Sequence, residues 1–170
     1  MHDAPILDFA LHHLTLGRAA LFEAIQGNME HGIRSAEWES VRCELDTAVL
    51  GLRRAGQQNF LPLGLLTRAW LRFLTGALTG PESAQADLDE AWEIAARGPM
   101  KLFLADIHLH RARLFGLAIA DCRLPIEGAK YPWQSPAADL AAAAKLINAC
   151  GYHRRNVELA DAQRALLPRP

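Results

Sequence analysis

The dipeptide Arg-Ala occurs five times in this sequence, and four of the copies lie inside alternate segments whose apolar periodicity predicts a helix. The alanines of these four copies are Ala19, Ala69, Ala112 and Ala165, and a leucine stands two residues after each of them. A unit that repeats in this way cannot bury its apolar face alone and must stack on neighbouring copies. The repeat therefore favours an array of similar helical units over a bundle of unrelated helices.

A second pattern marks the helices between these four. The spacing Leu-x-x-Ala occurs at Leu45/Ala48, Leu88/Ala91 and Leu140/Ala143, and glycines follow at Gly56, Gly98 and Gly151. Small alanines suit places where two helices cross closely, because they let the backbones approach. The two patterns alternate along the chain, which predicts three helical hairpins and one closing helix.

Apolar residues at three- and four-residue steps, with glycines and prolines between them, place the helix boundaries. Glycines in the segment 27–34 are expected to end the first helix, and residues 122–135 are expected to form a loop. Nowhere does the period-two alternation of a strand occur, so the predicted fold class is all-α. The expected helices cover residues 6–26, 35–55, 61–75, 83–97, 101–120, 137–149 and 155–167.

Composition excludes several classes of protein. The chain has 170 residues and a formal net charge of -1, which fits one domain over residues 1–170 and argues against a nucleic-acid partner, since such proteins usually carry a basic face. No window is apolar enough for a membrane span. Three widely spaced cysteines, Cys43, Cys122 and Cys150, fit a reducing compartment. We expect a cytoplasmic protein.

The hairpin pattern resembles a divergent tetratricopeptide-repeat (TPR) array. When Ala69 is aligned with the small residue in the first helix of that repeat, Gly76 falls at the hairpin turn and Ala84, Leu88 and Ala91 fall on the second helix. The phrases GLRRAGQQNFLPLGLLTRA, DLDEAWEIA and LADIHLHRARL look like the repeat arrays that end bacterial multidomain signalling ATPases and related regulators. No phosphate-binding glycine loop is present, so the resemblance implies no ATPase here.

The resemblance implies a right-handed α-α superhelix, a solenoid whose concave groove is lined by the odd-numbered helices. We expect a noncatalytic scaffold or sensor module that binds a peptide or protein segment in this groove and that belongs to, or associates with, a larger signalling protein. The residues expected to face the groove are His13, Leu63, Leu66, Trp70, Phe73, Asp106, Leu109 and Arg113.

Two alternatives remain open. One is a small helical-bundle enzyme or ligand-binding domain with a pocket built from His12, His108 and Asp106; the other is a self-association module of a larger signalling protein. Seven histidines invite a metal site, but neighbouring His12 and His13 point to different helix faces and no HExxH spacing occurs. We therefore predict no catalytic residue, cofactor or metal.

The arginines of the repeated dipeptide also suggest ion pairs between the helices of a hairpin. We expect Arg68 or Arg111 to pair with an aspartate on an even-numbered helix, such as Asp89.

Overall fold

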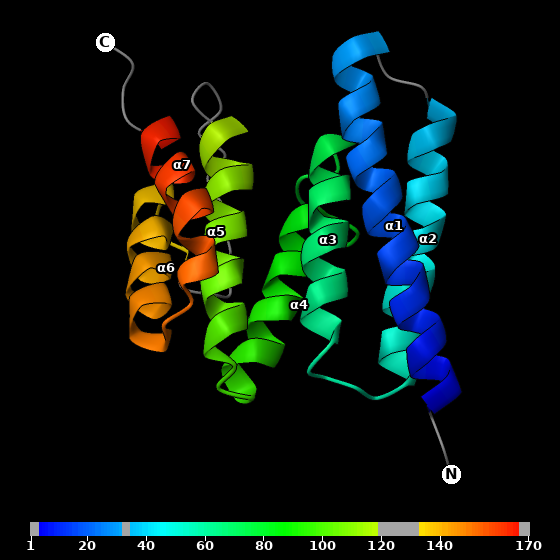
Figure 1. The fold of residues 1–170 in the computed structure, drawn as a ribbon, viewed down its shortest axis with the longest axis horizontal. Helices are drawn as coiled ribbons and strands as arrows, with labels where there is room; N and C mark the ends of the chain where they lie inside the picture. The colour runs from blue at the N-terminus through cyan, green and yellow to red at the C-terminus, as the bar shows by residue number, and fades with distance from the viewer. Residues whose placement is uncertain (1–3, 32–34, 119–132, 167–170) are drawn as a thin grey trace. The chain divides into compact units, whose positions relative to one another are not determined.

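Helices predicted from the sequence are present in the computed structural model, which describes residues 4–31, 35–118 and 133–166. Over these residues the chain is all-α, with no strand (Figure 1). The α-helices are α1 (Ala4–His31), α2 (Ser35–Arg54), α3 (Leu61–Leu74), α4 (Ala84–Arg97), α5 (Lys101–Ala118), α6 (Pro136–Cys150) and α7 (Asn156–Leu166), with a 3-10 turn η1 (His153–Arg155) before α7.

Most predicted helix ends are confirmed. Gly56, Gly76 and Gly151 all have positive φ, the left-handed conformation that ends helices at glycine. At the start of α6 the Ser135 hydroxyl accepts a hydrogen bond from the Ala138 amide at 3.1 Å, and Pro136 follows in the first turn. The predicted loop 122–135 lies outside the described residues except for its last three.

One boundary was predicted wrongly. Helix α1 does not end at Gly27 but continues to His31, and a Cβ at Gly27 would meet nothing within 4 Å. An exposed interior glycine costs a helix only about 1 kcal/mol relative to alanine, so the glycine does not end it. Residues 32–34, the rest of that predicted turn, lie outside the described residues.

The chain divides into two compact units, residues 1–90 and 91–170, and the division falls inside α4. A single domain over residues 1–170 stays a prediction. In the first unit α1 packs along α2, and α3 packs against both. The first half of α4 belongs to this unit, where Arg68 of α3 reaches Asp87 of α4.

Glycines allow the close approach of α1 and α2. A Cβ at Gly17 would lie 2.6 Å from Leu45 Cδ2, and a Cβ at Gly51 would lie 2.7 Å from the Cβ of Ala10. Both distances are shorter than van der Waals contact, so any larger residue would separate the helices. The two helices are therefore held by small residues as well as by the buried apolar stripe between them.

In the second unit α5 packs against α6, and α7 packs against both. One buried cluster joins the three helices; it includes Ala112 and Ala143 of the two sequence patterns, whereas Ala165 of α7 is exposed. Its members are Ala105, Leu109, Ala112, Leu140, Ala143, Ile147, Tyr152, Leu159 and Ala162.

The position of Ala112 generates the first prediction. Its side chain is 1% exposed at the contact of α5 with α6 and α7, so Ala112→Leu should lower the free energy of unfolding by about 1 to 3 kcal/mol through overpacking. Ala141→Leu is the matched control, because Ala141 is exposed on α6. Chemical denaturation of both variants measures the effect, and equal midpoints would contradict the prediction.

Candidate functional site

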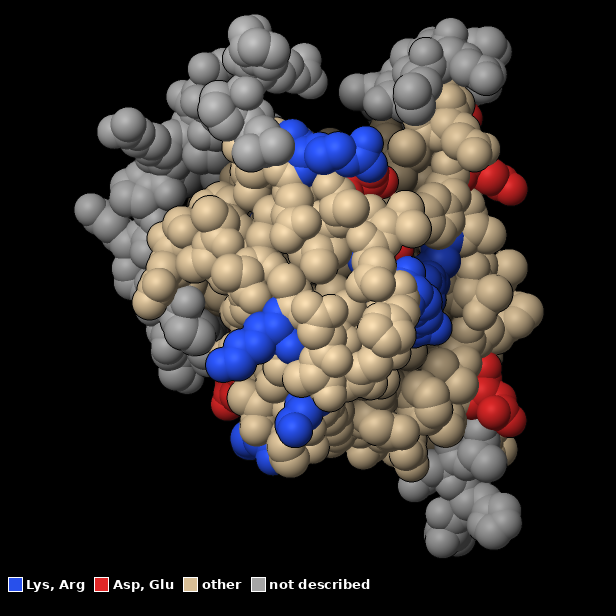
Figure 2. Space-filling model, turned by 60° about the vertical axis from the view of Figure 1, so that its left-hand side comes forward, with Lys and Arg blue, Asp and Glu red and all other residues tan. Residues whose placement is uncertain are grey.

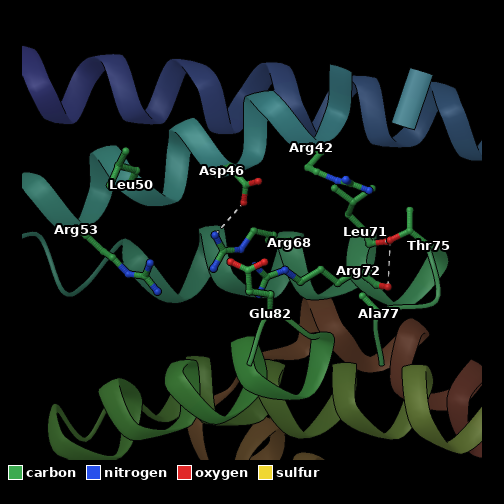
Figure 3. A pocket seen from close by; sticks show the side chains of 10 residues that line it. All are labelled: Arg42, Asp46, Leu50, Arg53, Arg68, Leu71, Arg72, Thr75, Ala77 and Glu82. Atoms are coloured by element: carbon green, nitrogen blue, oxygen red, sulfur yellow. Dashed lines mark hydrogen bonds and ion pairs between the residues drawn. The ribbon is translucent and has the colours of Figure 1, made fainter. Parts of the chain in front are cut away.

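A cleft of about 470 Å³ opens in the first unit between α2, α3 and the segment that joins α3 to α4. Figure 3 shows its side chains: Arg42, Asp46 and Arg53 project from α2, while Arg68 and Arg72 project from α3. Four arginines and two acidic residues give it a strongly polar lining. We call it the arginine cleft; its remaining lining residues are Leu50, Leu71, Thr75, Ala77 and Glu82.

The floor of the arginine cleft is a buried ion pair between α3 and α4. Arg68 donates to both carboxylate oxygens of Asp87, from Nε at 3.0 Å and from Nη2 at 2.7 Å. The Asp87 side chain is only 2% exposed. Burial alone would lower the pKa of Arg68, but the hydrogen bonds and charges of Asp87 and Asp46 outweigh it and raise that pKa. Arg68 is thus a permanent cation at the base of the cleft.

A second guanidinium shares the same carboxylate. Arg72 lies one helical turn after Arg68, and its Nη1 is 3.0 Å from Asp87 Oδ1. Arg72 Nη1 also donates weakly to the Ser83 carbonyl at 3.4 Å. Two guanidiniums against one buried carboxylate leave one positive charge that Asp87 does not neutralise.

That charge is met from the solvent side by Asp46. Arg68 Nη1 donates to Asp46 Oδ1 at 3.0 Å, and the Asp46 side chain is 49% exposed. Towards the rim, Arg53 pairs with Glu90 and Arg42 pairs with Glu39 at 3.4 Å, all through well-exposed side chains. Exposed pairs of this kind contribute about 0 to 1 kcal/mol, so the rim charges are free to exchange partners.

The floor pair recurs in the second unit. Arg111 Nε of α5 is 3.0 Å from Asp139 Oδ2 of α6, and His108 Nδ1 donates to the other oxygen of Asp139 at 2.9 Å. Here Trp133 covers the pair: the Arg111 guanidinium lies 4.5 Å from the Trp133 ring centre. Trp92 packs edge-on against both His108 and Trp133. The same charge pair is therefore covered by aromatic rings in one unit and borders a cleft in the other.

The expected pairing of Arg68 and Arg111 with aspartates of even-numbered helices is confirmed: Arg68 pairs with Asp87, and Arg111 pairs with Asp139. Asp89, the example given for such a partner, accepts a hydrogen bond from Gln85 at 2.6 Å on its own helix. Three of the acids that pair with the preceding helix are Glu44, Asp87 and Asp139; Glu44 accepts from His13 at 2.6 Å. Each stands directly before the leucine of Leu-x-x-Ala. That acid-Leu-x-x-Ala spacing is the signal in the sequence that could have located the site.

Residues expected in the concave groove take several environments. Leu66, Leu109 and Asp106 are buried, so they present no surface in the described conformation. Trp70 is partly buried and packs edge-on against Phe22 of α1, with 5.8 Å between ring centres. Leu63 and Phe73 are also partly buried. The groove itself stays a prediction.

The arginine cleft uses the other side of α3. Successive residues of an α-helix are about 100° apart. The cleft residues Arg68, Leu71, Arg72 and Thr75 therefore lie on the face opposite to Leu63, Leu66, Trp70 and Phe73. The repeat alignment predicted a binding groove on the apolar face of α3, whereas the cleft lies on the charged face of this helix.

His108 and Asp106, two of the residues expected in the pocket of the alternative enzyme, take different partners. His108 pairs with Asp139, whereas Asp106 accepts from Arg155 Nε at 2.8 Å and from the Tyr152 hydroxyl at 3.1 Å. His12 is exposed in the other unit. Arg113, from the predicted groove, lies 3.7 Å from Glu158 at the edge of the Asp106 network.

Surface charge is scattered over the described residues. Figure 2 shows Lys and Arg side chains in separate groups on a largely uncharged face. Among the described residues, no three His, Cys, Asp or Glu side chains are placed to hold one metal ion. Across the same residues, no helix combines the length and apolar character needed to cross a bilayer.

Comparison of the chain with models of known protein families, with curated proteins and with solved structures finds no match. The resemblance to tetratricopeptide repeats therefore rests on the residues of this sequence alone.

The buried floor generates the second prediction. Asp87→Asn removes the anion between Arg68 and Arg72, and breaking a buried pair in this way costs about 3 to 5 kcal/mol. Asp161→Asn is the control, since it makes the same chemical change at an acid whose pair is exposed. Denaturation midpoints should fall far more for Asp87→Asn. Similar losses in both variants would show that the cross-helix pair does not hold the floor together.

His110 generates a third prediction. Burial lowers its pKa despite the hydrogen bond that its Nδ1 donates to the Asp106 carbonyl at 2.9 Å. The folded state thus prefers the neutral ring, while the unfolded chain protonates near its ordinary pKa of about 6.5. The contribution of neutral His110 to the free energy of unfolding is complete above a pH of about 6.5. It falls as the pH drops below this value, by up to about 1.4 kcal/mol per pH unit.

The measurement for His110 is the free energy of unfolding at neutral and mildly acidic pH. His110→Gln should show a smaller loss between the two conditions than the wild type. His153→Gln is the control, because His153 is exposed. An unchanged pH dependence in His110→Gln would contradict the prediction.

Proposed function

We propose that this chain is a noncatalytic binding module that holds an acidic segment of a partner protein in the arginine cleft. The observation that carries the proposal is the position of Asp46. Its exposed carboxylate already occupies the solvent side of Arg68, at 3.0 Å from Nη1, and so marks the place where a partner's carboxylate would bind.

The contrast between the two acids on Arg68 supports exchange at one of them only. Asp87 is buried and accepts from two guanidiniums, so it stays in place when a ligand arrives. Asp46 is half exposed and holds Arg68 through one hydrogen bond. An exposed pair is worth little in water. A carboxylate that also reaches Arg72 or Arg42 would gain contacts that Asp46 does not make.

Size and composition favour a peptide side chain or two over a large cofactor. The cleft volume lies towards the lower end of the 300 to 1,000 Å³ range typical of ligand sites. Its guanidiniums offer planar, bidentate donors, which suit carboxylates in particular. Leu50 and Leu71 add apolar surface beside them.

The wider proposal keeps the arrangement inferred from the repeat: a TPR-like solenoid in the cytoplasm that serves as scaffold or sensor, alone or within a larger signalling protein. The recurrence of the cross-helix acid pair in successive hairpins supports a repeated unit. The alternative of a helical-bundle enzyme is less favoured, since His108 and Asp106 have separate partners.

A titration with a fluorescein-labelled peptide of glutamate and glycine tests the proposal. We expect binding that weakens with salt. Asp46→Asn should bind the peptide up to about fivefold more tightly, because it removes a competing carboxylate whose pair is worth about 0.2 to 1 kcal/mol. Arg42→Gln should bind it more weakly by a similar factor. Asp161→Asn is the matched control, since it removes one acid from an exposed pair outside the cleft.

Other ligands separate the possible outcomes. If inorganic phosphate competes fully at millimolar concentration, the cleft takes small anions and the peptide proposal is wrong. If a lysine peptide binds better than the glutamate peptide and Asp46→Asn weakens it, the cleft has the opposite charge preference. Circular dichroism melts of each variant establish that the fold is intact.

A further inference from the structure

A second hollow, of about 340 Å³, lies beside the arginine cleft between α1 and α2. Its lining is mainly apolar, and three of its residues are unusually exposed: Phe9 at 56%, Leu50 at 48% and Ile6 at 40%. We call it the apolar groove; its other lining residues are Pro5, Thr47, Gly51 and Arg54.

Gly51 explains why a hollow forms here. At this residue α2 approaches α1 so closely that a Cβ would lie 2.7 Å from the Cβ of Ala10. The contact at the crossing is made by Gly51 and Ala10, and the hollow lies beside it, lined by Phe9 on one helix and Leu50 on the other. Because the contact is formed by backbone and small residues, the larger apolar side chains remain exposed at the surface.

Leu50 joins the two hollows, since it lines both of them. At about 100° per residue along α2, Asp46 and Arg53 point to the cleft side, and Thr47 and Arg54 point to the groove side. Leu50 falls between the two sets. One exposed leucine therefore forms the ridge between a charged site and an apolar one.

The charges of the groove agree with those of the cleft. Arg54 is its only charged lining residue, and within the described part of the chain no ion pair neutralises it. A segment that carries a negative charge in the cleft is therefore not repelled along the groove. Exposed apolar patches with a polar rim are typical of interaction sites, and amphipathic segments bind with their apolar face in such grooves.

We propose that the partner segment is amphipathic and acidic and that it binds across Leu50, with a carboxylate in the arginine cleft and a large apolar side chain in the apolar groove. This inference rests on the proposed function of the cleft. It adds the second recognition element: the module selects an acidic residue next to an aliphatic or aromatic one, and Leu50 and Phe9 act as the apolar anchors of the site.

Selection of random peptides displayed on phage against the purified full chain tests this inference. We expect enriched peptides to combine acidic residues with a nearby leucine, isoleucine or phenylalanine. Synthetic versions should bind Leu50→Ser and Phe9→Ser roughly tenfold more weakly than the wild type. Leu16→Ser is the matched control, because Leu16 is 43% exposed on α1 and lines neither hollow.

The outcomes distinguish the two proposals. Enrichment of acidic peptides without apolar residues, with equal binding to Leu50→Ser, would overturn the amphipathic inference and leave the acid-binding cleft in place. If peptides with no acidic preference were selected, the proposed function would fail as well. A thermal melt of Leu50→Ser and Phe9→Ser establishes that any loss of binding occurs on a folded chain.

Discussion

The carboxylate of Asp87 holds the first unit's polar centre together. It is buried between α3 and α4, and it accepts from Arg68 while Arg72 lies 3.0 Å away. A buried charge is tolerated only when it is paired, and so these three side chains constrain one another. Because Asp87 holds Arg68 and Arg72 from one side, their remaining donors face the cleft.

The same pair has different surroundings in the two units. Arg111 and Asp139 repeat the charge pairing of Arg68 and Asp87, but Trp133 lies over the guanidinium and Trp92 packs beside Trp133. In the first unit the equivalent side of Arg68 meets the exposed Asp46 instead. The ion pair that joins the two helices of a hairpin is thus covered by aromatic rings in the second unit and borders the cleft in the first unit. This difference is the physical reason to place the binding site in the first unit.

Asp46 and Leu50 lie one turn apart on α2, and together they relate the two proposals. In the proposal, Asp46 supplies a carboxylate that the ligand replaces, and Leu50 supplies apolar surface that is exposed to solvent. Electrostatic contacts of exposed groups add little affinity but help to orient a partner, whereas apolar burial adds affinity. A site that combines them would bind reversibly and still discriminate between segments.

The sequence by itself determined the all-α class, most helix ends and the pairing of Arg68 and Arg111 with acids on the following even-numbered helix. These features are local or periodic. Gly56, which has positive φ, follows Arg53-Arg54 at the end of α2, and Pro136 follows Ser135 at the start of α6. Arg68 and Arg111 belong to the recurring Arg-Ala dipeptide. Tertiary structure decided that Asp87 pairs with Arg68 and that Asp139 pairs with Arg111, because each step along a helix changes the direction of a side chain by about 100°. It also decided that the cleft lies on the charged face of α3, since a hollow depends on which side chains of α2 and of the segment between α3 and α4 converge there, and no spacing within one helix records that convergence.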